Sequence, residues 1–373
     1  MPVRKHNDKA PSETLNERAG RTDTRIMPET PRDQAPENIL VHGDNLAAYA
    51  QFSNQLRRRA RLAFMDPPYN RKRNFEQYAD SEDSAKWLAD IETRIDICRD
   101  TLNDEGSMWI TIDDTESHYL KVTCDKVFGR ENFIANIIWQ KKYTVANDVR
   151  HFSKTHDHIL VYAKNAKIWR PHRRDRTVQM DARYANPDQD PHGPWKSTPL
   201  HAKSGAGKNQ SPYIFQNGVS WSPPPGTYFR YATSTLAQLE ADGAIAFGKP
   251  GNVPRRKTYL HDVPSGPPYN TIWLRDEVGD NHEAKRENAG HENPFDTPKP
   301  LRLMRRIIEI STDPGDLVVD LYAGSGTTAV AAIQTGRRFF VVESGNHART
   351  HALPRIREYE REKNSPPSQF VVV

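Results

Sequence analysis

Strand-length and helix-length patterns alternate through much of the chain. Short apolar runs have the length of buried strands and fall at 38–42, 62–65, 108–112, 317–321 and 339–342. Between them, apolar spacings of three and four residues predict helices at 46–56, 88–102, 116–128 and 301–308, and a run of small residues predicts one at 329–333. This alternation predicts an α/β fold in which helices cover both faces of a parallel sheet.

The pattern changes near both ends and in the middle of the chain. Residues 1–37 carry many charges and prolines without an apolar period, which predicts a flexible tail. Across 139–275 the helical period fades and Pro and Gly accumulate, so we expect an inserted, irregular, β-rich module. The insert would divide the α/β domain into halves at 38–138 and 276–360, with a C-terminal tail at 361–373.

Composition indicates the kind of partner and the cellular compartment to expect. The chain has 53 Lys and Arg against 48 Asp and Glu, for a net charge of +5, which fits an anionic partner. Cys98 and Cys124 are the only cysteines, so the sequence supports neither a disulfide framework nor a cysteine zinc site. No apolar run approaches the ~18 residues of a membrane-spanning helix. We therefore expect a soluble protein of the reducing cytoplasm without a membrane partner.

Basic and aromatic residues alternate within the insert. Basic side chains can neutralise phosphates while aromatic rings and guanidinium planes contact bases, which favours a nucleic-acid partner. An ordinary solvated loop domain is the alternative. The candidates are Lys141, Lys142, Arg150, Lys154, Arg170, Arg173, Arg174, Arg176, Arg255, Arg256 and Lys257, with Tyr143, Trp169, Trp195 and Trp221.

The string Asp66-Pro67-Pro68-Tyr69 follows the apolar run at 62–65 directly. Proline has no amide hydrogen for a sheet, so the strand must end there and present Asp66 and Tyr69 at its carboxyl end. Ligands of open α/β sheets bind at that end, although a surface turn is the alternative. A second Pro-Pro-Tyr string, at 267–269, lacks both the acid and the strand and predicts only a turn.

Other acids also stand near predicted strand ends. Asp44 precedes the helix at 46–56 and can serve as its N-cap. Asp113 and Asp114 follow the run at 108–112. Paired acids can bind a metal ion, but after a strand they more often cap the next helix.

A glycine-rich turn follows the strand predicted at 317–321. Gly324, Gly326 and Ala329 fit the spacing G-x-G-x-x-A, and Glu343 stands 19 positions beyond Gly324. This pattern is typical of nicotinamide dinucleotide sites, where an acid holds ribose hydroxyls. Only 30 residues follow Glu343, too few for the remaining strands of such an enzyme. Asp320 and Glu343 would also repel phosphate, so a nucleoside without pyrophosphate, such as S-adenosylmethionine, fits better.

These segments together resemble the permuted, beta-class amino-group DNA methyltransferases, in which the catalytic motif precedes the cofactor motif. The likeness extends over about 38–345 and includes the modification subunits of type III restriction systems and their stand-alone relatives. Matching segments are 41–46, 65–70, 257–260, 276–287, 297–300 and 320–328 with Glu343. The chain is short for a type III modification subunit.

The resemblance implies a Rossmann-like, S-adenosylmethionine-dependent fold with an inserted target-recognition module and double-stranded DNA as substrate. Asp66 and the Pro67 carbonyl would accept the amino hydrogens of a flipped adenine, within the motif completed by Pro68, and Tyr69 would stack on the base. No metal is required. The implied cofactor-binding residues are Asp44, Thr297, Lys299, Asp320, Ala323, Gly324, Ser325, Gly326, Thr327 and Glu343.

Alternatives remain within and outside this class. Cytosine N4 transfer uses the same chemistry but usually has Ser in place of Asp66, so Asp66 favours adenine N6. A catalytically silent DNA-specificity subunit is an alternative of another kind, and a nicotinamide enzyme is a more distant one. The resemblance also implies a homodimer, and a restriction subunit is a candidate partner.

Overall fold

The computed structural model gives the conformation of most of the chain beyond the predicted tail at 1–37, which lies outside the described residues. The described residues are 38–71, 73–74, 79–80, 82–145, 149–205, 211–248, 253–287, 295 and 297–373. Within these ranges, no helix combines the length and the apolar character needed to cross a membrane.

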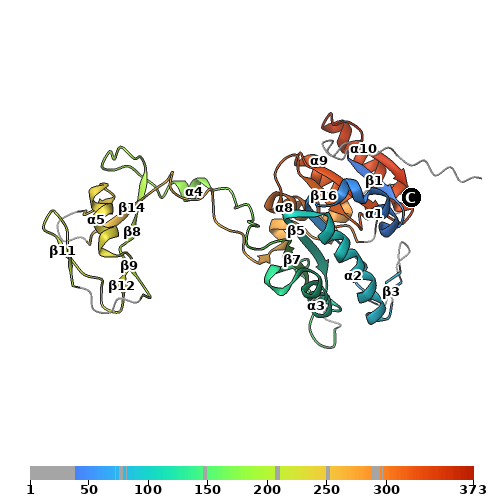
Figure 1. Ribbon diagram of the computed structural model, residues 1–373, viewed down its shortest axis with the longest axis horizontal. Helices are drawn as coiled ribbons and strands as arrows, with labels where there is room; N and C mark the ends of the chain where they lie inside the picture. The colour runs from blue at the N-terminus through green and yellow to red at the C-terminus, as the bar shows by residue number, and fades with distance from the viewer. Residues whose placement is uncertain are drawn as a thin grey trace, which may run out of the picture. The chain divides into compact units, whose positions relative to one another are not determined.

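The largest sheet has nine strands in the order β15-β6-β7-β5-β2-β16-β17-β1-β18 (Figure 1). Neighbouring strands are parallel except at β7, which runs antiparallel to both β5 and β6. The strands are β1 (Ile39–His42), β2 (Ala60–Met65), β5 (Leu102–Ile112), β6 (Phe133–Gln140), β7 (His156–Ala163), β15 (Ile272–Trp273), β16 (Leu317–Asp320), β17 (Arg338–Glu343) and β18 (Gln369–Val372). The predicted α/β class with a mostly parallel sheet is confirmed.

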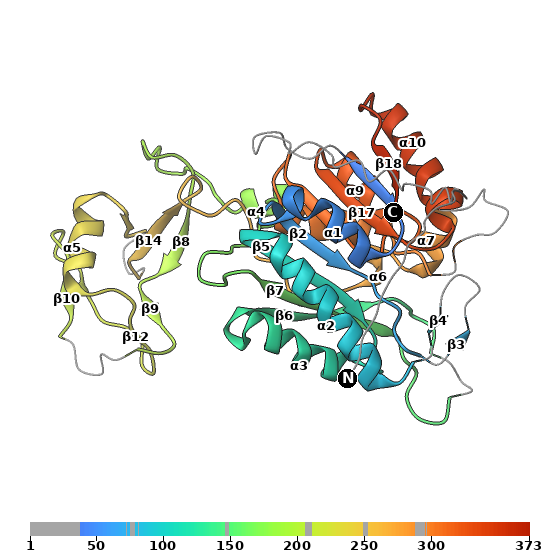
Figure 2. The same ribbon diagram turned by 45° about the vertical axis from the view of Figure 1, so that its right-hand side comes forward.

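Helices cover both faces of this sheet (Figure 2). One face packs against α1 (Asn45–Leu56), α2 (Ser84–Thr101) and α3 (Ser117–Phe128); the other packs against α8 (Leu301–Ser311), α9 (Thr327–Gln334) and α10 (Leu353–Glu362). Along β2, Ala63 and Met65 enter the first core while Leu62 and Phe64 enter the second, because successive strand residues point to opposite faces. Because β2 is buried on both faces, its residues 62–65 form a continuous apolar run, and Arg61 is the one charged residue of the strand.

Helix α1 begins where a capping residue predicts it. The Asp44 carboxylate accepts hydrogen bonds from the amides of Leu46 at 2.9 Å and Ala47 at 3.1 Å, which satisfies two free donors of the first turn.

Shorter elements are the hairpin β3 (Arg73–Asn74) and β4 (Ala79–Asp80), a 3₁₀ turn at Arg130–Asn132, α6 (Arg275–Val278), α7 (Asn281–Glu287) and a π-helical turn at Ala348–Ala352.

Four strands of the large sheet, β6, β7, β15 and β18, lie where the sequence predicts none. β7 falls inside the expected irregular insert, yet Leu160, Tyr162 and their neighbours are buried in the main cores. Its polar start, His156-Asp157-His158, and the surrounding basic residues hide the short apolar run. β18 replaces part of the C-terminal tail expected at 361–373 and pairs in parallel with β1. The irregular structure expected at β7 and the tail expected at β18 were wrong, because strand pairing with distant segments outweighs the local composition.

The middle of the chain builds three small sheets, β13-β14-β8, β12-β9 and β10-β11. They enclose a separate small core that contains Leu200, Phe215, Trp221, Leu236 and Ile245. The elements are α4 (Val178–Asp181), β8 (Trp195–Pro199), β9 (His201–Ala202), β10 (Tyr213–Ile214), β11 (Ser220–Trp221), β12 (Tyr228–Phe229), α5 (Thr233–Ala241), β13 (Ile245–Ala246) and β14 (Arg255–Tyr259). The segment is β-rich, with short and irregular strands.

Candidate active site

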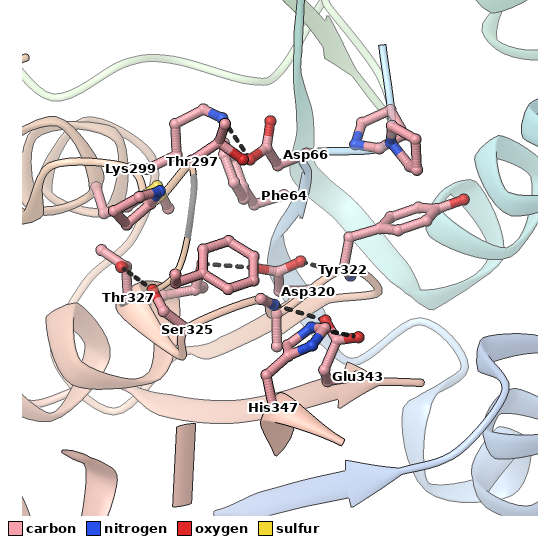
Figure 3. Close-up of a pocket in the computed structure, with 18 of the residues that line it drawn as sticks. Phe64, Asp66, Thr297, Lys299, Asp320, Tyr322, Ser325, Thr327, Glu343 and His347 are labelled. Atoms are coloured by element: carbon pink, nitrogen blue, oxygen red, sulfur yellow. Dashed lines mark hydrogen bonds and ion pairs between the residues drawn. The ribbon is translucent and has the colours of Figure 1, made fainter. Parts of the chain in front are cut away.

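Three acids follow or end adjacent parallel strands. Asp66 follows β2, Asp320 ends β16 and Glu343 ends β17, and these strands pair in that order. Their carboxyl ends therefore meet at one edge of the sheet, where open α/β folds bind ligands. A cavity at this edge is lined by all three acids (Figure 3). In that view Asp66 with Lys299 and Glu343 with His347 lie at opposite ends, with Asp320 between them.

Most of the site residues expected from the sequence line this one cavity. They are Asp66, Pro67, Pro68, Tyr69, Thr297, Lys299, Asp320, Ala323, Gly324, Ser325, Thr327 and Glu343. Asp44 instead lines an adjoining cavity, which shares Pro68, Tyr322 and Ser344 with the first. Gly326 does not line the cavity; it is the N-cap residue immediately before α9, in a left-handed conformation with φ of 79°.

The two carboxylate oxygens of Asp66 have different partners. Thr111 Oγ1, on the adjacent strand β5, donates to Oδ1 at 2.5 Å, and the Lys299 ammonium donates to Oδ2. The Asp66 side chain is 20% exposed and that of Lys299 10%. The carboxylate is therefore oriented from two sides while part of it still faces the cavity.

The turn after Asp66 is fixed by contacts to helices α2 and α3. Trp87 Nε1 donates to the Pro68 carbonyl at 2.9 Å. Asn70 is buried and adopts a left-handed conformation with φ of 56°, and its Nδ2 donates to Glu116 Oε1 at 2.9 Å. An asparagine tolerates this conformation better than most side chains. The Asp-Pro-Pro-Tyr turn is thus held rigidly against the helical layer.

Tyr69 is buried, with 7% of its surface exposed. The Arg71 guanidinium lies 4.5 Å from its ring centre and the Lys299 ammonium 5.3 Å, both within cation–π range. Burial, followed by the charges of Asp66 and Asp157, raises the pKa of the Tyr69 hydroxyl well above its usual range. The side chain therefore presents a neutral aromatic ring to the cavity.

The glycine-rich loop after β16 is held by Glu343. Its Oε2 accepts from the Gly324 amide at 2.7 Å, and its Oε1 accepts from the Gly345 amide at 2.8 Å. Gly324 has a φ of 53°, and a Cβ there would lie 3.2 Å from the Phe295 ring. Buried Arg355 supports the loop from behind, with Nη1 donating to Thr327 Oγ1 at 2.9 Å. The backbone can thus approach a ligand closely, and Glu343 spans both neighbouring loops.

Asp320 is almost fully buried beneath this loop, at 1% exposure. Its oxygens accept from the Tyr322 amide at 2.8 Å and the Thr328 hydroxyl at 2.5 Å. Burial raises the pKa of Asp320 to about 7; the two hydrogen bonds oppose this shift, and the charges of Asp66 and Glu343 add to it. The protonation of this carboxyl group therefore changes near neutral pH.

Several lining residues were missed by the sequence patterns: Arg71, Asp157, Asn281, Phe295 and His347. Asp157 lies on β7, whose place in the sheet was not predicted, and its buried carboxylate accepts from Lys141 Nζ at 2.5 Å. His347 Nε2 lies 2.9 Å from Glu343 Oε1. Of these residues, only Arg71 could have been proposed from the sequence, because it directly follows the matched segment 65–70.

Burial also corrects part of the expected DNA-contact set. Trp169 and Trp221 are core residues, at 4% and 5% exposure, so their rings cannot meet bases in this conformation. Lys141 and Lys257 are buried in ion pairs with Asp157 and with Asp188 and Asp190. By contrast, Lys142, Arg150, Lys154, Arg170 and Arg173 are exposed.

The fold and cavity define a Rossmann-like α/β protein whose ligand site combines a glycine-rich loop with an Asp-Pro-Pro-Tyr turn. A family model described as DNA methylase, for N6 and N4 methyltransferases, matches residues 60–353. The chain belongs to this DNA methylase family.

Curated relatives of this chain include subunits and single-chain enzymes. The Mod subunit of the type III restriction-modification enzyme StyLTI from Salmonella typhimurium is 29% identical, over 86% of this chain and 55% of its own. Type II methyltransferase M.EcaI from Enterobacter cloacae is 32% identical, over 86% and 69%. DNA adenine methyltransferase YhdJ from Escherichia coli is 26% identical, over 82% and 77%. The chain thus spans about half the length of the type III subunits it matches.

Solved structures also resemble the chain. The DNA modification methylase TTHA0409 from Thermus thermophilus, complexed with S-adenosyl-L-methionine, aligns with a TM-score of 0.47 and 17% identity. The alignment covers 90% of this chain and 99% of that one.

Proposed function

We propose that this protein transfers a methyl group from S-adenosylmethionine to the N6 amino group of an adenine in double-stranded DNA. One observation carries the proposal: Asp66 of the Asp-Pro-Pro-Tyr turn shares a single cavity with Gly324 and Glu343 of the glycine-rich loop. Membership of the DNA methylase family supports the same reaction. Relatives named as modification subunits and as an adenine methyltransferase support the substrate.

The residues around the loop fit the proposed cofactor. Asp320 and Glu343 line the cavity as carboxyl groups, which suits a ligand with hydroxyl and cationic groups and disfavours a phosphate. The space that a Cβ at Gly324 would fill lies against the Phe295 ring, so the bare backbone there allows a close approach. When bound, S-adenosylmethionine supplies a methyl group activated by its sulfonium. Glu343 would hold the ribose, and Asp320 would lie near the methionine moiety.

Asp66 and Pro67 would prepare the target amine. The amino lone pair of adenine is delocalised into the ring, so the amine is a poor nucleophile. The Asp66 carboxylate accepts one amino hydrogen and the Pro67 carbonyl accepts the other, which localises the lone pair. Lys299 and Thr111 hold Asp66 from two sides, and Trp87 holds the turn. Catalysis then rests on positioning and electrostatic preorganisation.

Tyr69 would receive the base after it leaves the duplex. Unstacking a base costs a few kcal/mol, and one aromatic stack returns about 1–3 kcal/mol. The cations of Arg71 and Lys299 already contact this ring. An entering base would therefore share the ring with these cations or replace one of them.

The finer assignments rest on the motif and on the family. An acid at the first motif position favours adenine N6 over cytosine N4. A homodimer and a restriction subunit as partner stay predictions of the family resemblance. The relatives that belong to type III systems are named as Mod subunits, which is compatible with such a partner.

The test is to express the full chain in a bacterial host without DNA methylation and to sequence the genomic DNA for modified bases. We expect N6-methyladenine at one short sequence. Asp66→Ala, made in parallel, should lose this signal while the purified protein still binds S-adenosylmethionine.

Each other outcome points elsewhere. N4-methylcytosine would assign the cytosine reaction. An absence of modified bases, together with DNA binding but no photo-cross-linking to labelled S-adenosylmethionine, would identify a silent specificity subunit. Modification that persists in Asp66→Ala would refute the acceptor role of this carboxylate.

A further inference from the structure

Two histidines and an aspartate gather at the start of β7. His158 Nε2 lies 2.9 Å from Asp114 Oδ1, and His156 Nε2 lies 3.8 Å from the same oxygen. The potential ligand atoms of all three lie within 4.8 Å of one another. We propose that Asp114, His156 and His158 bind a divalent transition-metal ion, with zinc as the best fit.

Strand geometry explains why these residues meet. His156 and His158 are two positions apart on β7, so their side chains leave the same face of the sheet. Ile112 pairs with His158 across the antiparallel β5–β7 ladder, which brings Asp114, just beyond the end of β5, beside the histidines. The three ligands therefore come from two paired strands whose separation the sheet fixes.

The ligand set suits zinc. A tetrahedral zinc ion with nitrogen and oxygen ligands at about 2.0–2.2 Å places neighbouring ligand atoms about 3.3 Å apart. The two measured separations of 2.9 and 3.8 Å bracket this value. Two imidazoles and one carboxylate favour zinc over calcium or magnesium, which prefer all-oxygen sites. Water would complete the coordination, since the Asp114 and His156 side chains are 40% and 34% exposed.

The side chains of Asn136 and Lys154 contact two of the proposed ligands. His158 Nδ1 lies 3.0 Å from Asn136 Nδ2 and 3.2 Å from Asn136 Oδ1. With the amide oxygen as its partner, Nδ1 carries the proton and donates it there, which leaves Nε2 free for the metal. The His156 side chain lies 3.8 Å from Asp114, beyond hydrogen-bond distance, and makes no side-chain hydrogen bond within the described ranges. The Lys154 ammonium lies 4.0 Å from Asp114 Oδ2 and would move away when a divalent ion binds.

The site is separate from the proposed catalytic machinery but shares a strand with it. Asp157 stands between the two histidines and lines the active-site cavity, where its carboxylate pairs with Lys141. Alternation along β7 sends Asp157 to the opposite face from the histidines. A bound ion would therefore fasten the start of β7 to the end of β5 without entering the cavity. The role is structural and does not depend on the proposed methyl transfer.

The test is titration of the untagged full chain with ZnCl₂ by calorimetry at about pH 7.5. Co²⁺ is titrated in parallel to record its visible d–d absorption. We expect one ion per chain, an intense tetrahedral cobalt spectrum, and a higher midpoint of thermal unfolding with zinc. Asp114→Asn keeps an acceptor for His158 but removes the charge, and His156→Ala removes a ligand; each should weaken binding at least ~10-fold.

The controls are other histidines of the same region. His151→Ala removes an exposed histidine, and His118→Ala removes one whose ring centre lies 6.5 Å from that of His158. Both should bind zinc as the unsubstituted chain does. Absence of saturable binding, an octahedral cobalt spectrum, or equal zinc affinity in Asp114→Asn and His156→Ala would overturn the proposal.

Discussion

Lys299 donates a hydrogen bond to Asp66 Oδ2 although the two residues are 233 positions apart. Lys299 immediately precedes the Pro300 cap of α8, whereas Asp66 follows β2. The contact thus joins the segment that carries the proposed catalytic acid to the half of the chain that carries the glycine-rich loop. The family resemblance implied only that Lys299 lies at the cofactor site, and the contact with Asp66 adds a second candidate role, the orientation of that carboxylate.

Replacing Lys299 should impair methyl transfer through the orientation of Asp66. We expect Lys299→Met to lower kcat about 10- to 100-fold, because small displacements of a positioned group are costly. Lys299→Arg keeps a cation and should recover part of the rate. Steady-state methylation of a DNA duplex measures both. A Lys299→Met enzyme with unchanged kcat and a raised KM for the cofactor would instead place Lys299 in cofactor binding alone.

Tyr69 should tolerate loss of its hydroxyl but not of its ring. The hydroxyl oxygen is buried without a hydrogen-bond partner among the described residues, so Tyr69→Phe should keep both stability and activity. Tyr69→Leu keeps apolar volume but removes the stacking surface, worth about 1–3 kcal/mol per base. We expect it to reduce the fluorescence change of a duplex with 2-aminopurine at the target. Equal signals from Phe and Leu variants would refute the stacking role.

The raised pKa of Asp320 predicts a pH dependence of stability. An unfolded aspartate titrates near ~3.9, while burial raises the pKa of Asp320 to about 7 in the folded chain. Between these values the folded state holds a proton that the unfolded state has released, so this group contributes less stability as pH rises, up to about 7. Asp320→Asn cannot titrate. The difference in free energy of unfolding between Asp320→Asn and the unsubstituted protein should therefore shift in favour of the variant as pH rises across this window. Above about pH 7 this difference should stay constant.

The same group should make cofactor binding pH-dependent. The ionised carboxylate favours a cationic ligand, so affinity for S-adenosylmethionine should rise as pH increases through about 7. Calorimetric titration at several pH values measures this trend. The Asp320→Asn variant should bind more weakly at high pH and show a flatter profile. Parallel profiles for both proteins would assign the dependence to another group.

Exposed basic residues between β6 and β7 should contribute to DNA binding. Lys142 and Arg150 are exposed, and Phe152 nearby is 92% exposed. Removing a cation that neutralises one phosphate should reduce the slope of log K against log salt by about 0.9. We expect this from Arg150→Ala, measured by fluorescence anisotropy on duplex DNA. Lys86→Ala on α2, which removes an exposed lysine paired with Glu82, is the control and should leave the slope unchanged.

The parts of the site that depend on local pattern could be predicted from the sequence. Asp66 and Glu343 come directly after short apolar runs, and Asp320 stands one residue before the end of another. Such runs identify strand ends without knowledge of the sheet order. The prolines after Asp66 and the glycines after Asp320 add specific backbone constraints. These features survive in the fold because each is determined by a few neighbouring residues.

The missed residues depend on pairing between distant segments. Asp157 reaches the cavity only because β7 inserts antiparallel between β5 and β6, which brings its first residues to the edge where the parallel strands end. Phe295 contacts His347 at 5.1 Å between ring centres although 52 positions separate them. No periodicity encodes such contacts, and residues of this kind carry no local signal.

Gly326 offers a test of how tightly the glycine-rich loop is built. Its φ is 79°, and a Cβ added there would lie 3.2 Å from Cα and Cβ of Ala352 in the π-helical turn. Gly315 has a similar φ of 87° but open space around it. Gly315→Ala should therefore cost about 1 kcal/mol from backbone strain alone. Gly326→Ala should cost more and also weaken cofactor binding, because the loop must shift away from Ala352. Urea unfolding of both variants measures the two losses of stability, and their difference gives the cost of the contact with Ala352 beyond backbone strain. Equal losses of stability would show that the loop can move away from Ala352 at no cost.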